Sequence, residues 1–136
     1  MERRFQRDLS SLPELSRFVQ EFLSRQGLAP SNAYDLDLIL EELFTNVLKY
    51  SSGTDEVAVR LTRDDSIVTI ALSEYGAARA YDITRSPEPD LSRPMAERPV
   101  GGLGIHMVRQ LAETIRYEYK DRVSTTTITK KVSANA

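Results

Sequence analysis

Hydrophobic residues recur at helical spacing in two stretches of the first fifty residues. In the first stretch, residues 10–14 combine serine and proline in a way typical of a helix start, and Gly27 is typical of a helix end. The apolar residues of this stretch are Leu15, Phe18, Val19, Phe22 and Leu23. The second stretch begins at residues 30–32, and its apolar face consists of Leu36, Ile39, Leu40, Leu43, Phe44 and Val47. This spacing predicts two amphipathic helices that each bury one face.

Alternation of apolar and polar residues predicts five strands. Residues 3–8 are predicted to form a first short strand. A hairpin follows, in which the alternating residues 57–61 precede the apolar run 67–72. A second hairpin joins the alternating residues 115–119 to the threonine-rich residues 123–132. The strands of each hairpin are therefore expected to pair in antiparallel fashion.

A long segment without periodicity separates the two hairpins. Residues 75–100 contain four of the six prolines, and a helix is predicted after them over residues 103–113. Loops of this length inside a compact domain are usually functional lids or disordered segments, and the glycine cluster that follows this one favours a lid, which we expect at residues 77–100. The order of elements predicts an α+β fold, a two-layer sandwich whose mixed, mostly antiparallel sheet is covered by helices on one face.

The composition is that of a soluble globular protein. The chain has 136 residues, of which 40% are hydrophobic and 28% charged, and no apolar run approaches the roughly 20 residues of a membrane helix. Residues 1–9 lack the apolar stretch of a secretory signal. The absence of cysteine excludes disulfides and thiolate metal ligands. A net charge of −2 gives no sign of the basic surface that binds nucleic acid. We expect one cytoplasmic domain, residues 1–136, that binds neither membrane nor nucleic acid.

A polar stripe borders the apolar face of the second predicted helix. Glu42, Asn46 and Lys49 recur at i, i+4 and i+7, so a carboxylate, an amide and an ammonium share one side of the helix. Such a stripe can supply a base, a metal ligand and a phosphate contact. The alternative is the solvated face of an ordinary amphipathic helix. The stripe lies next to the apolar face and not opposite it, which favours the rim of a cleft.

Three glycines stand directly before the third predicted helix, at positions 101, 102 and 104. Bare backbone N–H groups at the positive end of a helix bind anionic phosphate. A plain tight turn that caps the helix is the alternative. Three glycines in four residues after a long loop favour the phosphate site. Together with the polar stripe they predict a nucleotide site.

These motifs, in this order and spacing, resemble those of the anti-sigma-factor serine kinases, a bacterial branch of the GHKL ATPases. Residues 42–49 match the N box of that family, and residues 101–106 match its glycine-rich G2 box. The resemblance covers nearly the whole chain. It implies the Bergerat fold, which is the fold of the histidine-kinase-like ATPases.

The resemblance implies a role for each matched residue. Glu42 would be the general base, Asn46 the ligand of a Mg²⁺ ion that carries the ATP phosphates, and Lys49 a phosphate contact. The glycine segment, consisting of Gly101, Gly102, Leu103, Gly104 and Ile105, would hold the phosphates beneath the lid. The chemistry agrees with these roles, because phosphoryl transfer depends mainly on positioning and charge neutralisation, and a carboxylate can accept a serine proton.

One motif departs from the family pattern. Where the family has aspartate-x-glycine after the second hairpin strand, this chain has Glu74 and Gly76. In the family, the aspartate accepts a hydrogen bond from the adenine amino group. Glutamate is one methylene longer, so we expect it either to displace the base or to point elsewhere. Both residues are candidates for nucleotide binding.

The resemblance implies an ATP-dependent serine/threonine protein kinase that acts as an anti-sigma factor or partner-switching regulator. Such a protein would hold a sigma factor and inactivate an anti-anti-sigma antagonist by phosphorylating its serine. Members of the family usually dimerise, so a homodimer is expected. Two alternatives keep the fold. One is a catalytically weak or inactive partner-binding module with a degenerate nucleotide site, and the other is the ATPase domain of a histidine-kinase-like system with a separate phosphoacceptor.

Overall fold

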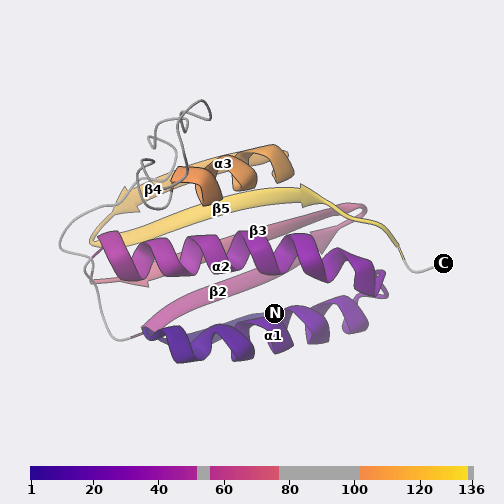
Figure 1. The fold of residues 1–136 in the computed structure, drawn as a ribbon, viewed down its shortest axis with the longest axis horizontal. Coiled ribbons are helices and arrows are strands. Elements are labelled where there is room, and N and C mark those ends of the chain that lie inside the picture. Colours follow the sequence, from indigo (N-terminus) through magenta and orange to yellow (C-terminus); the bar gives the residue numbers. More distant parts are fainter. Residues whose placement is uncertain (52–55, 77–101, 135–136) are drawn as a thin grey trace.

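A computed structural model describes residues 1–51, 56–76 and 102–134, in which a five-stranded sheet carries helices on one face (Figure 1). The strands are β1 (Glu2–Gln6), β2 (Glu56–Asp64), β3 (Ile67–Tyr75), β4 (Thr114–Lys120) and β5 (Val123–Lys131). The helices are α1 (Leu12–Arg25), α2 (Ala33–Tyr50) and α3 (Gly102–Leu111), with short 3₁₀ turns η1 (Leu9–Ser11) and η2 (Pro30–Asn32). The predicted α+β architecture is confirmed.

The sheet has the strand order β1-β2-β3-β5-β4, and each of these four pairings is antiparallel. Strand β3 pairs with β5 along its whole length, from Ile67 opposite Lys131 to Tyr75 opposite Val123. It therefore extends three residues beyond the predicted apolar run. The alternation that buries Leu72 on the helix-covered face continues to Glu74, which is placed inside the fold by the strand itself.

The core lies between the sheet and the three helices. Helix α2 occupies the middle of the helical layer, with α1 on one side and α3 on the other (Figure 1). Fully buried side chains from every layer meet there, among them Phe5, Phe18, Phe22, Phe44, Leu61, Ile70, Val108 and Ile128. Among the described residues, no helix is both long and apolar enough to cross a membrane.

Two further boundaries that differ from the sequence prediction have a local reason. The first strand ends at Gln6 and not at residue 8, because the Asp8 carboxylate accepts a hydrogen bond from the Ser10 N–H and begins η1. Helix α3 ends at Leu111, because the Glu113 N–H already donates to the Thr129 carbonyl of β5. The predicted lid at 77–100 lies outside the described residues.

The end of the described chain is fastened to the start of α2. The Asn32 amide donates from Nδ2 to the Ser133 carbonyl at 2.7 Å and accepts from the Ser133 N–H at 3.1 Å. Leu28 and Ala134 form a further isolated bridge. These contacts hold the segment after β5 against the turn between the first two helices.

Candidate functional site

Two of the predicted site residues form a hydrogen-bonded pair on α2. The Asn46 side chain donates from Nδ2 to the Glu42 carboxylate at 3.1 Å and to the Glu42 backbone carbonyl at 2.6 Å. Asn46 is only 2% exposed, and Glu42 is half-buried. The pair is therefore not the solvated surface of an amphipathic helix. The i, i+4 spacing aligns the two groups, and burial fixes them.

The polar stripe of α2 meets the first turn of α3. A Cβ atom added to Gly104 would overlap the Cδ and both carboxylate oxygens of Glu42. The Glu42 carboxylate thus lies directly against the Gly104 backbone, where any side chain would exclude it. The two sequence motifs, about sixty residues apart, are brought into contact by the packing of α3 on α2.

Burial raises the pKa of the Glu42 carboxyl above the usual value for glutamate. The hydrogen bond from Asn46 and the positive charge of Lys49 lower this pKa in part, and the neighbouring charge of Glu41 raises it. Lys49 itself is exposed at the end of α2. A carboxylate with a raised pKa is a stronger proton acceptor than a free one, which suits a general base.

The remaining atom of the Asn46 amide fits the implied metal. Its Oδ1 is buried and has no hydrogen-bond partner in the described part of the chain, whereas Nδ2 makes both bonds to Glu42. An amide oxygen is a suitable ligand for Mg²⁺, which takes its other ligands from phosphates and water. Within the described ranges, no group of three or more acidic or histidine side chains could hold a metal ion by itself.

Glu74, which the sequence resemblance matches to the family aspartate, is almost completely buried, at 1% exposure. It does not point away from the fold. Its Oε1 lies 3.4 Å from a terminal nitrogen of Arg7, and the same nitrogen donates to the carbonyls of Val47 and Ser51 at 2.8 and 2.5 Å. Arg7 was not among the candidate residues, because no local pattern marks it and its partner lies 67 residues away.

The other predicted residues take several places in the structure. Gly76 directly follows β3 with a φ of 67°, in the left-handed region that favours glycine. Gly102 opens α3 and Leu103 continues it. The Ile105 side chain is buried in the core, so only its backbone is suited to a ligand. Gly101 lies outside the described residues.

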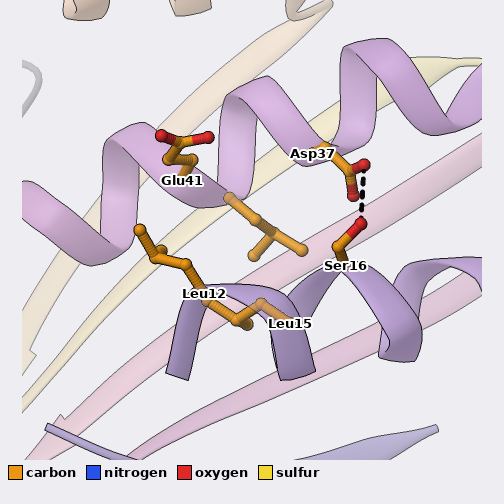
Figure 2. Close-up of a pocket in the computed structure, with 6 residues that line it drawn as sticks. Leu12, Leu15, Ser16, Asp37 and Glu41 are labelled. Atoms are coloured by element: carbon orange, nitrogen blue, oxygen red, sulfur yellow. Dashed lines mark hydrogen bonds between the residues drawn. The ribbon is translucent and has the colours of Figure 1, made fainter. Parts of the chain in front are cut away.

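A separate small pocket of about 100 Å³ lies between α1 and α2. Figure 2 shows its lining, in which the Ser16 hydroxyl donates to Asp37 at 3.1 Å. Burial raises the Asp37 pKa, the Ser16 bond lowers it, and the charge of Glu41 raises it. This pocket faces α1, whereas Glu42 faces α3, so it does not belong to the site described above.

The antiparallel sheet, the three covering helices and the carboxylate–amide pair beside Gly104 together define a domain of the histidine-kinase ATPase type. The chain belongs to the family described as Histidine kinase-like ATPase domain, which it matches over residues 5–130. The family resemblance noted in the sequence is thereby confirmed.

Several known proteins are similar to this chain. Serine-protein kinase RsbW of Bacillus cereus (strain AH820) is 24% identical over 113 residues, which cover 80% of this chain and 70% of RsbW, and RsbW of Bacillus anthracis matches equally. The structure of the RsbU and RsbW domains of Rv1364c from Mycobacterium tuberculosis superposes with a TM-score of 0.62 at 17% identity, covering 100% of this chain.

That superposition covers 34% of the Rv1364c chain, so the present chain spans about a third of its length. The histidine kinase AdeS of Acinetobacter baumannii superposes with a TM-score of 0.51 at 18% identity, over 100% of this chain and 68% of AdeS. These structures confirm the fold. The sequence comparisons make the chain a distant relative of the RsbW kinases.

Proposed function

We propose that this chain is an ATP-dependent serine/threonine protein kinase that acts as an anti-sigma factor or a similar partner-switching regulator. Its relation to the RsbW serine-protein kinases supports this assignment. The observation that carries it is the position of the Glu42 carboxylate, whose pKa is raised by burial, against the backbone of Gly104. A base in this place would lie beside the helix N-terminus that suits phosphate.

Each site residue has one task in the proposed reaction. The backbone N–H groups of the first turn of α3 would bind the phosphates, and Asn46 Oδ1 would hold a Mg²⁺ ion that offsets their charge. The antagonist's serine oxygen forms a bond to the γ-phosphorus of ATP, while the bond from that phosphorus to the leaving oxygen of ADP breaks. Glu42 takes the serine proton, and Lys49 balances charge near the phosphates.

The proposed partners follow from the same assignment. A sigma factor and its unphosphorylated anti-anti-sigma antagonist would compete for the chain, and phosphorylation of the antagonist would end the competition. We place this activity in the cytoplasm, in a single domain over residues 1–136 that pairs with a second copy.

The first test compares two neighbouring glutamates on α2. Glu42→Gln removes the proposed base, and Glu41→Gln removes an exposed carboxylate one residue earlier. We expect Glu42→Gln to bind ATP within a few fold of wild type but to transfer phosphate about 10²-fold more slowly or worse. Glu41→Gln should transfer at nearly the wild-type rate. Equal rates for wild type and Glu42→Gln would exclude Glu42 as the base.

The assay uses labelled ATP and a panel of purified anti-anti-sigma antagonists, each paired with its serine-to-alanine variant. Phosphoserine is stable to acid and labile to alkali, and phosphohistidine behaves in the opposite way, so the product also tests the histidine-kinase-like alternative. Asn46→Ala should weaken ATP binding measured by calorimetry with Mg²⁺ and change it little without the ion. Unchanged affinity in both conditions would remove the metal role.

A second candidate function is a partner-binding module with a degenerate nucleotide site. The ion pair between Arg7 and Glu74 is the observation that raises it, because one oxygen of the carboxylate at the proposed adenine position already has a partner. Calorimetry distinguishes the two functions. An absence of binding at millimolar ATP with Mg²⁺ would favour the module, and micromolar binding would favour the kinase.

A further inference from the structure

Buried polar atoms without hydrogen-bond partners gather at one end of α2. Among the described residues five such atoms occur, and four of them belong to Asn46, Ser51, Arg7 and Glu74. The fifth belongs to Asp37 in the separate pocket. Native proteins keep few groups of this kind, because each costs about 1–3 kcal/mol when no partner compensates for lost water. A cluster of them indicates a place prepared for a polar ligand.

Arg7 connects three parts of this cluster through a single nitrogen. That nitrogen donates to the carbonyls of Val47 and Ser51 at 2.8 and 2.5 Å, and it lies 3.4 Å from Glu74 Oε1. The end of α2 thus fixes the guanidinium, and the guanidinium in turn fixes the carboxylate. Arg7 is 18% exposed and Glu74 is 1% exposed, so the pair is shielded from water. A charge as deeply buried as that of Glu74 requires such a partner.

The two oxygens of Glu74 have different surroundings. Oε1 is engaged by Arg7, whereas Oε2 is buried and has no partner among the residues that the structure describes. A carboxylate oxygen only accepts hydrogen bonds, so Oε2 suits a ligand that presents an N–H group and rejects one that presents a carbonyl. The 6-amino group of adenine is such a donor, and the 6-hydrogen of unsubstituted purine is not.

We propose that Arg7 is a positioning residue for nucleobase recognition, which holds Glu74 by one oxygen and leaves the other to accept from the amino group of adenine. This inference rests on the proposed function, since it assumes that the site binds ATP. It also explains how a glutamate can stand where the family has the shorter aspartate. The longer side chain has more rotamers, and the arginine, fixed by two backbone carbonyls, selects one of them.

Arg7 also has a structural task, because it joins the segment after β1 to the end of α2. Loss of Arg7 will therefore lower stability whether or not the residue acts on the base. The experiment must use a quantity that a purely structural role would leave unchanged. The ratio of affinities for two ligands that differ only at the 6-amino group is such a quantity, because a general loosening of the site weakens both.

The test measures the dissociation constants of ATP and of purine riboside triphosphate, which lacks the 6-amino group, by calorimetry with Mg²⁺. Wild type should prefer ATP by about tenfold or more, the scale of a hydrogen bond to a charged group. Arg7→Met keeps the apolar stem but removes the charge, and its preference should fall to nearly one. Arg7→Lys keeps a positive charge on a shorter side chain, so its ratio of ATP to purine riboside triphosphate affinity should lie between those of wild type and Arg7→Met. If Arg7→Met does not fold, the ratio of Arg7→Lys decides the question.

Arg3→Met is the matched control. Arg3 also lies near the start of the chain and pairs with a glutamate, Glu21, at 3.2 Å, but on α1. The ratio of ATP to purine riboside triphosphate affinity of Arg3→Met should equal that of wild type. If the Arg7 variants keep the wild-type ratio, Arg7 is only structural and the proposal is wrong. If wild type binds both triphosphates equally, the proposal fails while ATP binding stands. If wild type binds neither at millimolar concentration, the proposed function fails with it.

Discussion

The contact between Glu42 and Gly104 allows a sharp test of the site, in which one methyl group is added. In Gly104→Ala, the new Cβ would overlap the Glu42 carboxylate, far inside the roughly 3.5 Å at which two carbon atoms make contact. Either α3 or the carboxylate must move. Because Ile105 and Val108 bury α3 in the core, the end of the glutamate side chain moves more easily. We therefore expect the carboxylate to shift by about 1 Å or more.

The expected effects on stability and on transfer differ in size. Alanine in place of glycine inside a helix adds about 0.5–1 kcal/mol to the stability, and loss of the bond from Asn46 Nδ2 to the Glu42 carboxylate removes about 1 kcal/mol. The free energy of unfolding should therefore stay within about 1 kcal/mol of wild type. A 1 Å misplacement of a catalytic group can reduce the rate by about 10²-fold. Transfer should fall on that scale, with ATP affinity changed only a few fold.

A second glycine provides the control. Gly27 has a φ of 65°, and a Cβ added there would meet nothing within 4 Å. Gly27→Ala should therefore lose about 1–2 kcal/mol through backbone strain and keep the wild-type transfer rate. Urea unfolding and a phosphotransfer assay at saturating ATP measure both quantities. The reasoning is refuted if Gly104→Ala transfers at the wild-type rate. It is also refuted if Gly104→Ala slows a Glu42→Gln protein further, since both changes remove the same step.

Three further predictions concern pH and the packing of α2. Because burial raises the Glu42 pKa, the transfer rate should decline on acidification at a higher pH than for an ordinary glutamate, and Glu42→Gln should lose this dependence in a pH–rate profile. The raised pKa of Asp37 means that stability falls as pH rises from its unfolded value of 3.8 through the folded value. Asp37→Asn, which can still accept from Ser16, should thus be more stable than wild type in urea at pH 7 and equal to it near pH 3. Asn32→Ala removes both bonds to Ser133 and should lose about 1–3 kcal/mol in the same assay.

Local periodicity predicted most of the fold, because most of the helices and strands bury one face, although β4 contains no buried residue. The apolar stripe of residues 36–47 became the buried side of α2, and the alternation in residues 123–131 became β5. The prediction stopped β3 too early, at residue 72, because Ser73 and Glu74 are polar. A buried glutamate breaks the apolar alternation in sequence while it keeps the geometric alternation of the strand.

The site was predictable where its geometry is local. The four-residue spacing of Glu42 and Asn46 is a helical contact and needs no knowledge of the fold. The approach of Glu42 to Gly104 is a long-range contact, which the family motifs suggested and the packing of α3 on α2 supplies. Neither a local spacing nor a family motif indicated Arg7. Its role depends on where the end of α2 and the end of β3 meet, and no spacing within the sequence encodes that meeting.

The buried acceptors also bear on the choice between a kinase and an inactive binding module. Asn46 Oδ1 and Glu74 Oε2 lack partners within residues 1–51, 56–76 and 102–134, and each such group costs about 1–3 kcal/mol. Apolar residues of similar size at both positions would remove that cost and leave the outer surfaces of the helices unchanged for a partner. A protein that bound its partners only through those outer surfaces would gain nothing from these two buried polar groups. The two acceptors belong to the end of α2 and the end of β3, on the covered side of the sheet, so what they favour is a polar ligand bound inside the fold.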